Sequence, residues 1–331
     1  MVNLDLKDRK ILYQLDLNCR QSNTQIGKKV GLSRKVVEYR IKGMEDKGII
    51  SGYWTAINTF RLGYYVFRIY INFIDVNTSI KNEIINYFCN AKNVWAVITS
   101  KGPVELDVIL WVKDVYLFNM YWEETLRKYG IYFSDATVSI LTELISCKKS
   151  YLLLDNYDKD RKFYVTSCRG SSVKIDEIDY KLLDLIALDG RISVVDLAER
   201  LDCSSQTINY RLKNLLKKDV IKAFRVSSDA TKLGFQGSAI DVYLKDHSRK
   251  KEIIAYVCQE PHVYDLMVKS IGWSDLCFQM MIARMDDIFN MIDKLEKEFP
   301  NTIRKQNYWM SQKAHKERWL PEMTEKDFKK T

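Results

Sequence analysis

Two short segments place side chains that can hydrogen-bond to nucleic acid at the start of an expected helix. In the first, Ser33 is a good helix N-cap, and Arg34 and Lys35 follow it. Cationic side chains neutralise phosphates and can donate to O6 and N7 of guanine. In the second segment, Gln206 and Asn209 carry amides of the kind that pair bidentately with adenine. The chemistry that these residues predict is contact with double-stranded DNA.

The side chains expected to face DNA come from both segments. They are Ser33, Arg34, Lys35, Glu38, Tyr39 and Lys42, then Ser204, Ser205, Gln206, Thr207, Asn209, Tyr210 and Lys213.

The first segment is expected to be held in place by the secondary structure around it. Apolar residues at helical spacing predict a helix over 5–18, and Ser22 or Asn23 caps a shorter helix ending near Gly31. Val37 and Ile41 then give the third helix, to about residue 47, a narrow inward face. Three helices with a glycine-containing turn before the third predict a helix-turn-helix. Residues 48–57 are interpreted as two short strands, a wing.

The chain contains this pattern twice. Residues 5–64 align with 176–235 at a constant offset of 171, with 15 identities in 60 positions. Unrelated sequences would share about four. The match continues more loosely, pairing Val94 with Val263 and 102–105 with 272–275. A duplicated unit therefore spans about half the chain.

The remainder of each unit alternates strand and helix patterns. Residues 65–74, 94–99, 106–112 and 132–144 are expected strands, with helices at 78–89 and 115–128. The order is the ferredoxin-like βαββαβ unit. The predicted fold class is α+β, with two winged helix-turn-helix modules and two ferredoxin-like (RAM-type) domains in tandem. The expected boundaries are 1–60, 61–154, a linker at 155–172 with a short strand near 163–166, 173–231 and 232–331.

Bulk properties fit a folded intracellular protein. The 331 residues carry a net charge of +9 and 47% hydrophobic residues. Seven widely spaced cysteines without a C-x-x-C motif favour reduced thiols over disulfides or zinc. The charged start is unlike a signal peptide, and no apolar run reaches the ~20 residues that span a bilayer. We expect no membrane association, no metal, no cofactor and no catalytic residue, and a cytoplasmic, nucleoid-associated location.

The first unit resembles the leucine-responsive regulator/AsnC family. The matching residues are Leu4-Asp5 with Asp8, Gly31-Leu32-Ser33, Arg40-Ile41, Gly48 to Tyr53, and Leu62-Gly63-Tyr64. The resemblance covers nearly the whole chain, twice. It implies DNA-binding heads joined to amino-acid-binding regulatory domains that dimerise through their sheets. Family members are usually single units, so this chain looks like a covalent pseudo-dimer, open to further self-association through those sheets.

The resemblance also implies an effector site at the turn after the third strand of each regulatory domain. Its residues here would be Gly102 and Glu105, and Gly272 and Asp275. The two acids could face the ammonium group of an amino acid or related metabolite, or they could be ordinary acidic turn residues. The loops differ in sequence, Gly-Pro-Val-Glu against Gly-Trp-Ser-Asp, so a shared effector does not follow from the resemblance.

The two heads differ in charge. Residues 1–53 hold eleven Lys and Arg against six Asp and Glu, a net +5, whereas residues 173–225 hold ten against nine, a net +1. The first head is thus predicted to bind phosphates more strongly, and the second to read more sequence. For Arg40 and Arg211 two roles stay open, contact with a phosphate or pairing with an acid of the same head, such as Asp8 or Glu45. Tyr39 and Tyr210 are open between backbone contact and partial core packing.

Three functions compete. The first is a sequence-specific DNA-binding transcription regulator, not an enzyme. The second is a tetrapyrrole enzyme, because the double architecture also resembles the siroheme decarboxylases. The third is an architectural DNA-binding protein without an effector. The chain has only His247, His262 and His315, all in its second half, which gives the enzyme few candidate catalytic side chains.

Overall fold

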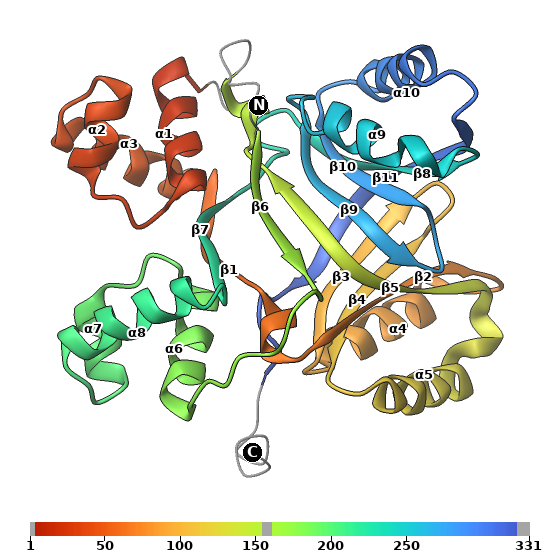
Figure 1. Cartoon of the computed structure of the whole chain (residues 1–331), viewed down its shortest axis with the longest axis horizontal. Coiled ribbons are helices and arrows are strands. Elements are labelled where there is room, and N and C mark those ends of the chain that lie inside the picture. The colour runs from red at the N-terminus through yellow and green to blue at the C-terminus, as the bar shows by residue number, and fades with distance from the viewer. Residues whose placement is uncertain (1–3, 154–160, 323–331) are drawn as a thin grey trace.

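Two helical heads lie side by side next to a strand barrel that carries helices on its outside (Figure 1). The computed structural model describes residues 4–153 and 161–322. Head 1 contains α1 (Leu6–Leu17), α2 (Asn23–Val30), α3 (Arg34–Asp46) and β1 (Ile50–Ile57). Head 2 contains α6 (Glu177–Leu188), α7 (Val194–Arg200), α8 (Ser205–Lys217) and β7 (Ile221–Ser228).

The two regulatory domains have the predicted βαββαβ order. The first contains β2 (Tyr65–Phe73), α4 (Thr78–Asn90), β3 (Val94–Lys101), β4 (Leu106–Val112), α5 (Val115–Tyr129) and β5 (Phe133–Cys147). A 3-10 turn, η3 (Ser150–Leu153), and β6 (Lys162–Ser167) follow, so the strand expected in the linker is present. The second contains β8 (Gln236–Leu244), α9 (Lys250–Val257), β9 (Val263–Ile271), β10 (Leu276–Ile282), α10 (Asp286–Glu298) and β11 (Ile303–Glu317).

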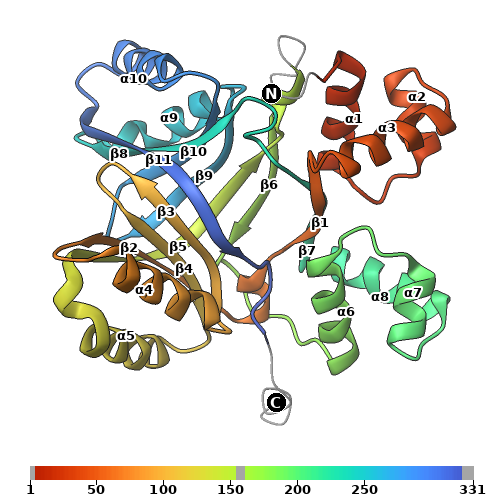
Figure 2. The ribbon, with the colours of Figure 1, turned by 180° about the vertical axis from the view of Figure 1, so that it is seen from behind.

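The strands of both domains form one continuous sheet. Its order is β2-β4-β3-β11-β8-β10-β9-β5-β6, and an additional β2–β5 pairing closes the sheet into a barrel with β6 outside the ring (Figure 2). The long strands β5 and β11 make this possible. Each pairs first with a strand of its own domain and then with one of the other, β5 with β9 and β11 with β3. Closure leaves no free edge within the ring, which makes the pseudo-dimer a single body.

A buried ion pair lies inside the barrel. Arg68 of β2 donates to both carboxylate oxygens of Asp107 of β4, at 2.8 and 2.6 Å, and both residues are almost fully buried. Burial alone would lower the pKa of Arg68, but the Asp107 charge raises it well above its ordinary value. Arg68 also lies over the ring of Trp309 from β11, so the pair joins the two domains.

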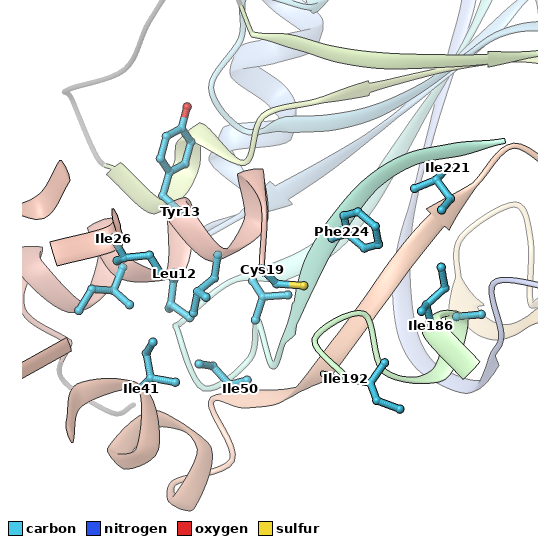
Figure 3. Close-up of a cluster of buried hydrophobic side chains, with 14 of the residues drawn as sticks. Leu12, Tyr13, Cys19, Ile26, Ile41, Ile50, Ile186, Ile192, Ile221 and Phe224 are labelled. Carbon is cyan, nitrogen blue, oxygen red and sulfur yellow. The ribbon is translucent and has the colours of Figure 1, made fainter. Parts of the chain in front are cut away.

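The heads share one apolar core. Ile11, Leu12 and Ile41 of head 1 belong to the same buried cluster as Ile186 and Leu212 of head 2. Figure 3 shows side chains from α1, β1, β7 and α6 meeting in this cluster. The two helix-turn-helix modules therefore form one body and not two tethered domains.

The interpretation of the wing as two short strands is wrong. Residues 50–57 form a single strand, β1, which pairs antiparallel with β7 of the other head. The interpretation as two strands assumed a local hairpin. The partner strand lies about 170 residues away in sequence, which a single repeat unit does not reveal.

Three general findings concern the residues described. In the described part of the chain, no helix is long and apolar enough to cross a membrane. Within the same ranges, no group of three or more His, Cys, Asp or Glu side chains is arranged to hold a metal ion. All seven cysteines are free thiols, and Cys19, Cys147 and Cys277 are buried.

Candidate nucleic-acid interface

The α3 helix presents its predicted DNA-facing side chains to solvent. Ser33 caps the helix by accepting from the Val36 backbone N–H at 3.4 Å. Val37, Ile41 and Met44 are buried, as their spacing predicted. The opposite surface is exposed and consists of Arg34, Lys35, Glu38, Tyr39 and Lys42. This division leaves the start of the helix free to enter a groove.

The α8 helix repeats this arrangement with other chemistry. Ser204 caps it by accepting from the Thr207 backbone N–H at 3.0 Å, and Thr207 is half-buried beside it. Asn209 donates its side-chain amide to the Ser205 carbonyl at 3.0 Å, so this donor is engaged within the helix. The exposed side chains are Ser204, Ser205, Gln206, Asn209, Tyr210 and Lys213.

The two tyrosines are surface residues. Tyr39 is 80% exposed and Tyr210 is 70% exposed, so neither packs into the core of its head. An aromatic ring with a hydroxyl that stands clear of the protein is suited to contact with a backbone phosphate. Of the two alternatives left open by the sequence, core packing is excluded.

Arg40 and Arg211 hold their heads together. Arg40 Nη1 lies 2.7 Å from Asp5 Oδ2 and 2.8 Å from Asp8 Oδ1, joining α3 to the start of α1. Arg211 makes the same contacts with Asp176 and Asp179, at 2.7 and 2.8 Å. The hydrogen bonds that each arginine donates to its two acids raise the pKa of that arginine. The pairing with Asp8 considered from the sequence is present, and the clamp fixes the angle of each recognition helix against its first helix.

Another repeated arginine crosses between the heads. Arg20 Nη1 donates to the backbone carbonyls of Gly190 and Ile192 in head 2, at 3.1 and 2.9 Å. Its counterpart Arg191 donates to Asn23 Oδ1 of head 1 at 2.9 Å and to the Tyr53 hydroxyl at 3.2 Å. The sequence showed these arginines only as repeat identities. Their role is to hold α3 and α8 at a fixed spacing, together with the β1–β7 ladder.

The predicted effector residues lie at two distant turns of the barrel. Glu105 accepts from the Phe73 backbone N–H at 2.9 Å and lies 3.3 Å from Lys81 Nζ. Asp275 accepts from the Leu244 backbone N–H at 2.7 Å. Both acids therefore tie a turn to the end of the first strand of the same domain. The structure does not bring them together, and their role as effector ligands stays a prediction.

The paired glycines of these turns allow a close approach between domains. Gly102 has φ +125° and a Cβ there would lie 2.9 Å from the Tyr308 carbonyl oxygen on β11. Gly272 has φ +116° and a Cβ would lie 2.3 Å from the Val138 carbonyl oxygen on β5. Any side chain would push the turn away from the crossing strand.

A cleft opens at the end of the barrel near the heads. It has a volume of about 520 Å³, and its walls include Tyr264 and Asp265 of β9, Gln279 of β10, and Trp309 and Glu317 of β11. Sequence reasoning missed it, since its lining residues are widely separated in sequence, from Ile98 to Trp319. The three histidines lie elsewhere, His262 beside the Met281 carbonyl, His315 beside Thr99 and His247 near Asp275.

Fold and interface together define a tandem winged helix-turn-helix protein with fused ferredoxin-like regulatory domains. The model for winged helix-turn-helix DNA-binding domains matches residues 4–51 and 175–222. The transcriptional regulator LrpA of Pyrococcus horikoshii is 32% identical over 111 residues, which cover 34% of this chain and 77% of LrpA. The regulator Ptr1 of Methanocaldococcus jannaschii is 32% identical over 112 residues, 34% of this chain and 74% of Ptr1. The chain belongs to the Lrp/AsnC family, in a tandem duplicated form.

Among solved structures, the fold of the whole chain is matched by the siroheme decarboxylase NirDL. The TM-score is 0.64 with 13% identity, and the match covers 98% of this chain and 97% of that one. The same enzyme in complex with an iron-uroporphyrin III analogue gives a TM-score of 0.63 at 14% identity. At this identity the likeness shows a shared architecture.

Proposed function

We propose that this chain is a sequence-specific, double-stranded DNA-binding transcription regulator of the Lrp/AsnC type that works as a fused pseudo-dimer. The observation that carries the proposal is the pair of exposed recognition helices, α3 and α8, on one rigid body. The β1–β7 ladder and the Arg20 and Arg191 crossings fix their spacing. Dimeric helix-turn-helix proteins use such fixed spacing to read two half-sites.

The two helices would divide the work. Arg34 and Lys35 at the exposed start of α3 supply cations for phosphate or guanine. Gln206 at the start of α8 supplies an exposed amide in a head of lower charge. Unlike heads on one chain favour a target site without a palindrome. The proposal includes control of DNA binding by a small metabolite. If no metabolite binds, the chain would instead be an architectural DNA-binding protein without an effector.

Selection of bound DNA from a random pool, at two salt concentrations, tests DNA binding and site symmetry together. Arg34→Glu with Lys35→Glu should weaken binding to the selected site about tenfold to a hundredfold and flatten its salt dependence. The matched control is Arg127→Glu with Lys128→Glu, an adjacent exposed pair on α5 of the barrel. Equal loss in both variants, or none in the first, would sink the assignment.

The whole-chain likeness to NirDL supports a second candidate, a tetrapyrrole decarboxylase that uses the 520 Å³ cleft. The cleft chemistry argues against it, because Asp265 and Glu317 would face the carboxylates of such a substrate. Incubation of the full chain with siroheme tests it by visible absorbance and by release of carbon dioxide. A bound absorbance band with product formation would favour the enzyme over the regulator.

A further inference from the structure

The cleft at the end of the barrel has a filled counterpart in the other unit. The register of the strands makes β5 residues Leu141 and Leu144 equivalent to β11 residues Ser311 and Ala314. The counterpart is lined by Trp54, Trp95, Leu141 and Leu144, and its volume is only about 30 Å³. The second unit therefore has a cavity where the first has a packed core.

The size changes all go in one direction. At equivalent lining positions, Trp95 is replaced by Tyr264 and Val66 by Gly237, in addition to the two leucines that become Ser311 and Ala314. Each change removes side-chain volume from the second unit. Large-to-small changes in a core cost stability unless something else occupies the space.

The lining of the open cleft is also more polar than that of its filled counterpart. Ala96 and Ile109, both buried, correspond to Asp265 and Gln279, which line the cleft. Strand pairing places Asp265 opposite Ser146, and Glu317 opposite Ala96. The open cavity has therefore gained two carboxylates and an amide that the filled one lacks.

The charged side chains that line the cleft are two carboxylates, Asp265 and Glu317, and one cation, Lys313. Arg225 and Lys149 both pair with Asp16, at 2.7 and 3.2 Å. Asp265 accepts a hydrogen bond from Ser146 Oγ at 2.5 Å, and the nearby charges of Arg225 and Lys149 partly offset the rise in its pKa that burial causes. Within residues 4–153 and 161–322, neither Asp265 nor Glu317 forms an ion pair within 4 Å. Asp265 is half-buried, whereas Glu317 is exposed. A half-buried acid without an ion-pair partner is costly unless a ligand neutralises it.

We propose that this cleft binds a small organic cation, a molecule that carries a primary amine. Its ammonium group would meet Asp265 and Glu317, and its chain would lie against the aromatic walls of Trp309 and Tyr264. The site is distinct from the turns of Glu105 and Asp275. It lies beside the segment from Ala230 to Gly237 that leads from head 2 into the barrel, where an occupant can influence the heads.

Calorimetry with the full chain tests this proposal, with putrescine as the probe and butanediol as its uncharged counterpart. We expect one putrescine site per chain and no heat from butanediol. Asp265→Asn should weaken binding about tenfold, as loss of one charge-assisted contact implies. Asp293→Asn, an exposed acid on a different cleft lined by α10, is the matched control and should bind as the parent does.

A second variant keeps both carboxylates and removes the space. Ser311→Leu with Ala314→Leu gives the cleft the residues of its filled counterpart, and we expect it to fold and to lose putrescine binding. Retained binding in this double variant would show that surface charge and not the cleft attracts the amine. No binding of putrescine by the parent, or equal binding of butanediol, would overturn the proposal.

Discussion

The two junctions between the heads and the barrel use different chemistry at positions that the repeat makes equivalent. At one junction, Arg225 of head 2 and Asp16 of head 1 form a buried ion pair, and Lys149, which follows β5 of the barrel, also pairs with Asp16. At the other, the equivalent residues are Trp54 and Ala187, and Trp54 stacks on Trp319 with ring centroids 3.6 Å apart. A duplicated chain can thus hold one junction by charge and the other by aromatic packing.

The two junctions also differ in how they can respond to a ligand in the cleft. Trp54 and Trp319 of the aromatic junction line the filled cavity, and Trp319 also lines the open cleft. The ionic junction does not line the cleft, but the charges of Arg225 and Lys149 partly offset the rise that burial causes in the pKa of Asp265 inside it. Charges near a ligand site can respond to its occupant through electrostatics. We infer that the ionic junction is the part of the molecule that responds to the charge of an occupant.

Breaking the ionic junction should have the largest effect. Asp16→Ala leaves Arg225 buried without its counter-charge, and we expect a loss of about 3–5 kcal/mol in the free energy of unfolding. Urea unfolding followed by circular dichroism measures this loss. Asp16→Ala with Arg225→Met removes both charges and should restore most of the stability. A single variant as stable as the parent would mean that the pair does not hold the junction.

Breaking the aromatic junction should cost less. Trp319 is half-buried and also contacts Trp95 edge-on, with centroids 5.6 Å apart. Trp319→Ala should lower the free energy of unfolding by about 2 kcal/mol, the order expected for a partly buried stacked ring. Trp319→Phe keeps an aromatic ring that can stack on Trp54, so this variant should retain most of the stability of the parent. A cost above that of Asp16→Ala would reverse the ranking of the junctions.

The sequence predicted the repeat, the helix-turn-helix elements and the βαββαβ order, because these depend on local periodicity and capping. It could not predict features that need both units at once. Asp16 and Arg225 are 209 residues apart, so their pairing has no local pattern. The mistaken prediction of two strands within one head has the same origin, since β1 pairs with β7 of the other head. The exposed faces of α3 and α8 could be predicted because the spacing of the apolar residues identifies the opposite, buried face of each helix.

The cleft gives a pH-dependent difference between the junctions. Burial raises the pKa of Asp265 from 3.8 to about 6, although Arg225, Ser146 and Lys149 partly offset this and Asp16 adds to it. A folded-state pKa above the unfolded value stabilises the fold at low pH, and the contribution is lost as the pH rises through about 6. Asp265→Asn should therefore match the parent near pH 4 and be about 3 kcal/mol more stable at pH 8. Urea midpoints across this range measure it, and a constant difference would contradict it.

Removal of the arginine clamp should have the smallest effect on stability, and the effect should be equal in the two heads. Arg40 and Arg211 have side chains 27% and 19% exposed, and each pairs with two acids. Arg40→Ala and Arg211→Ala should each cost about 0.5–1 kcal/mol in stability, as partly exposed pairs do. Because their charges are occupied, neither change should alter the slope of DNA affinity against salt. If a variant reduced the slope of DNA affinity against salt concentration by about one unit, the arginine would instead be a phosphate contact. If only Arg40→Ala reduced it, the heads would differ in how they hold DNA as well as in charge.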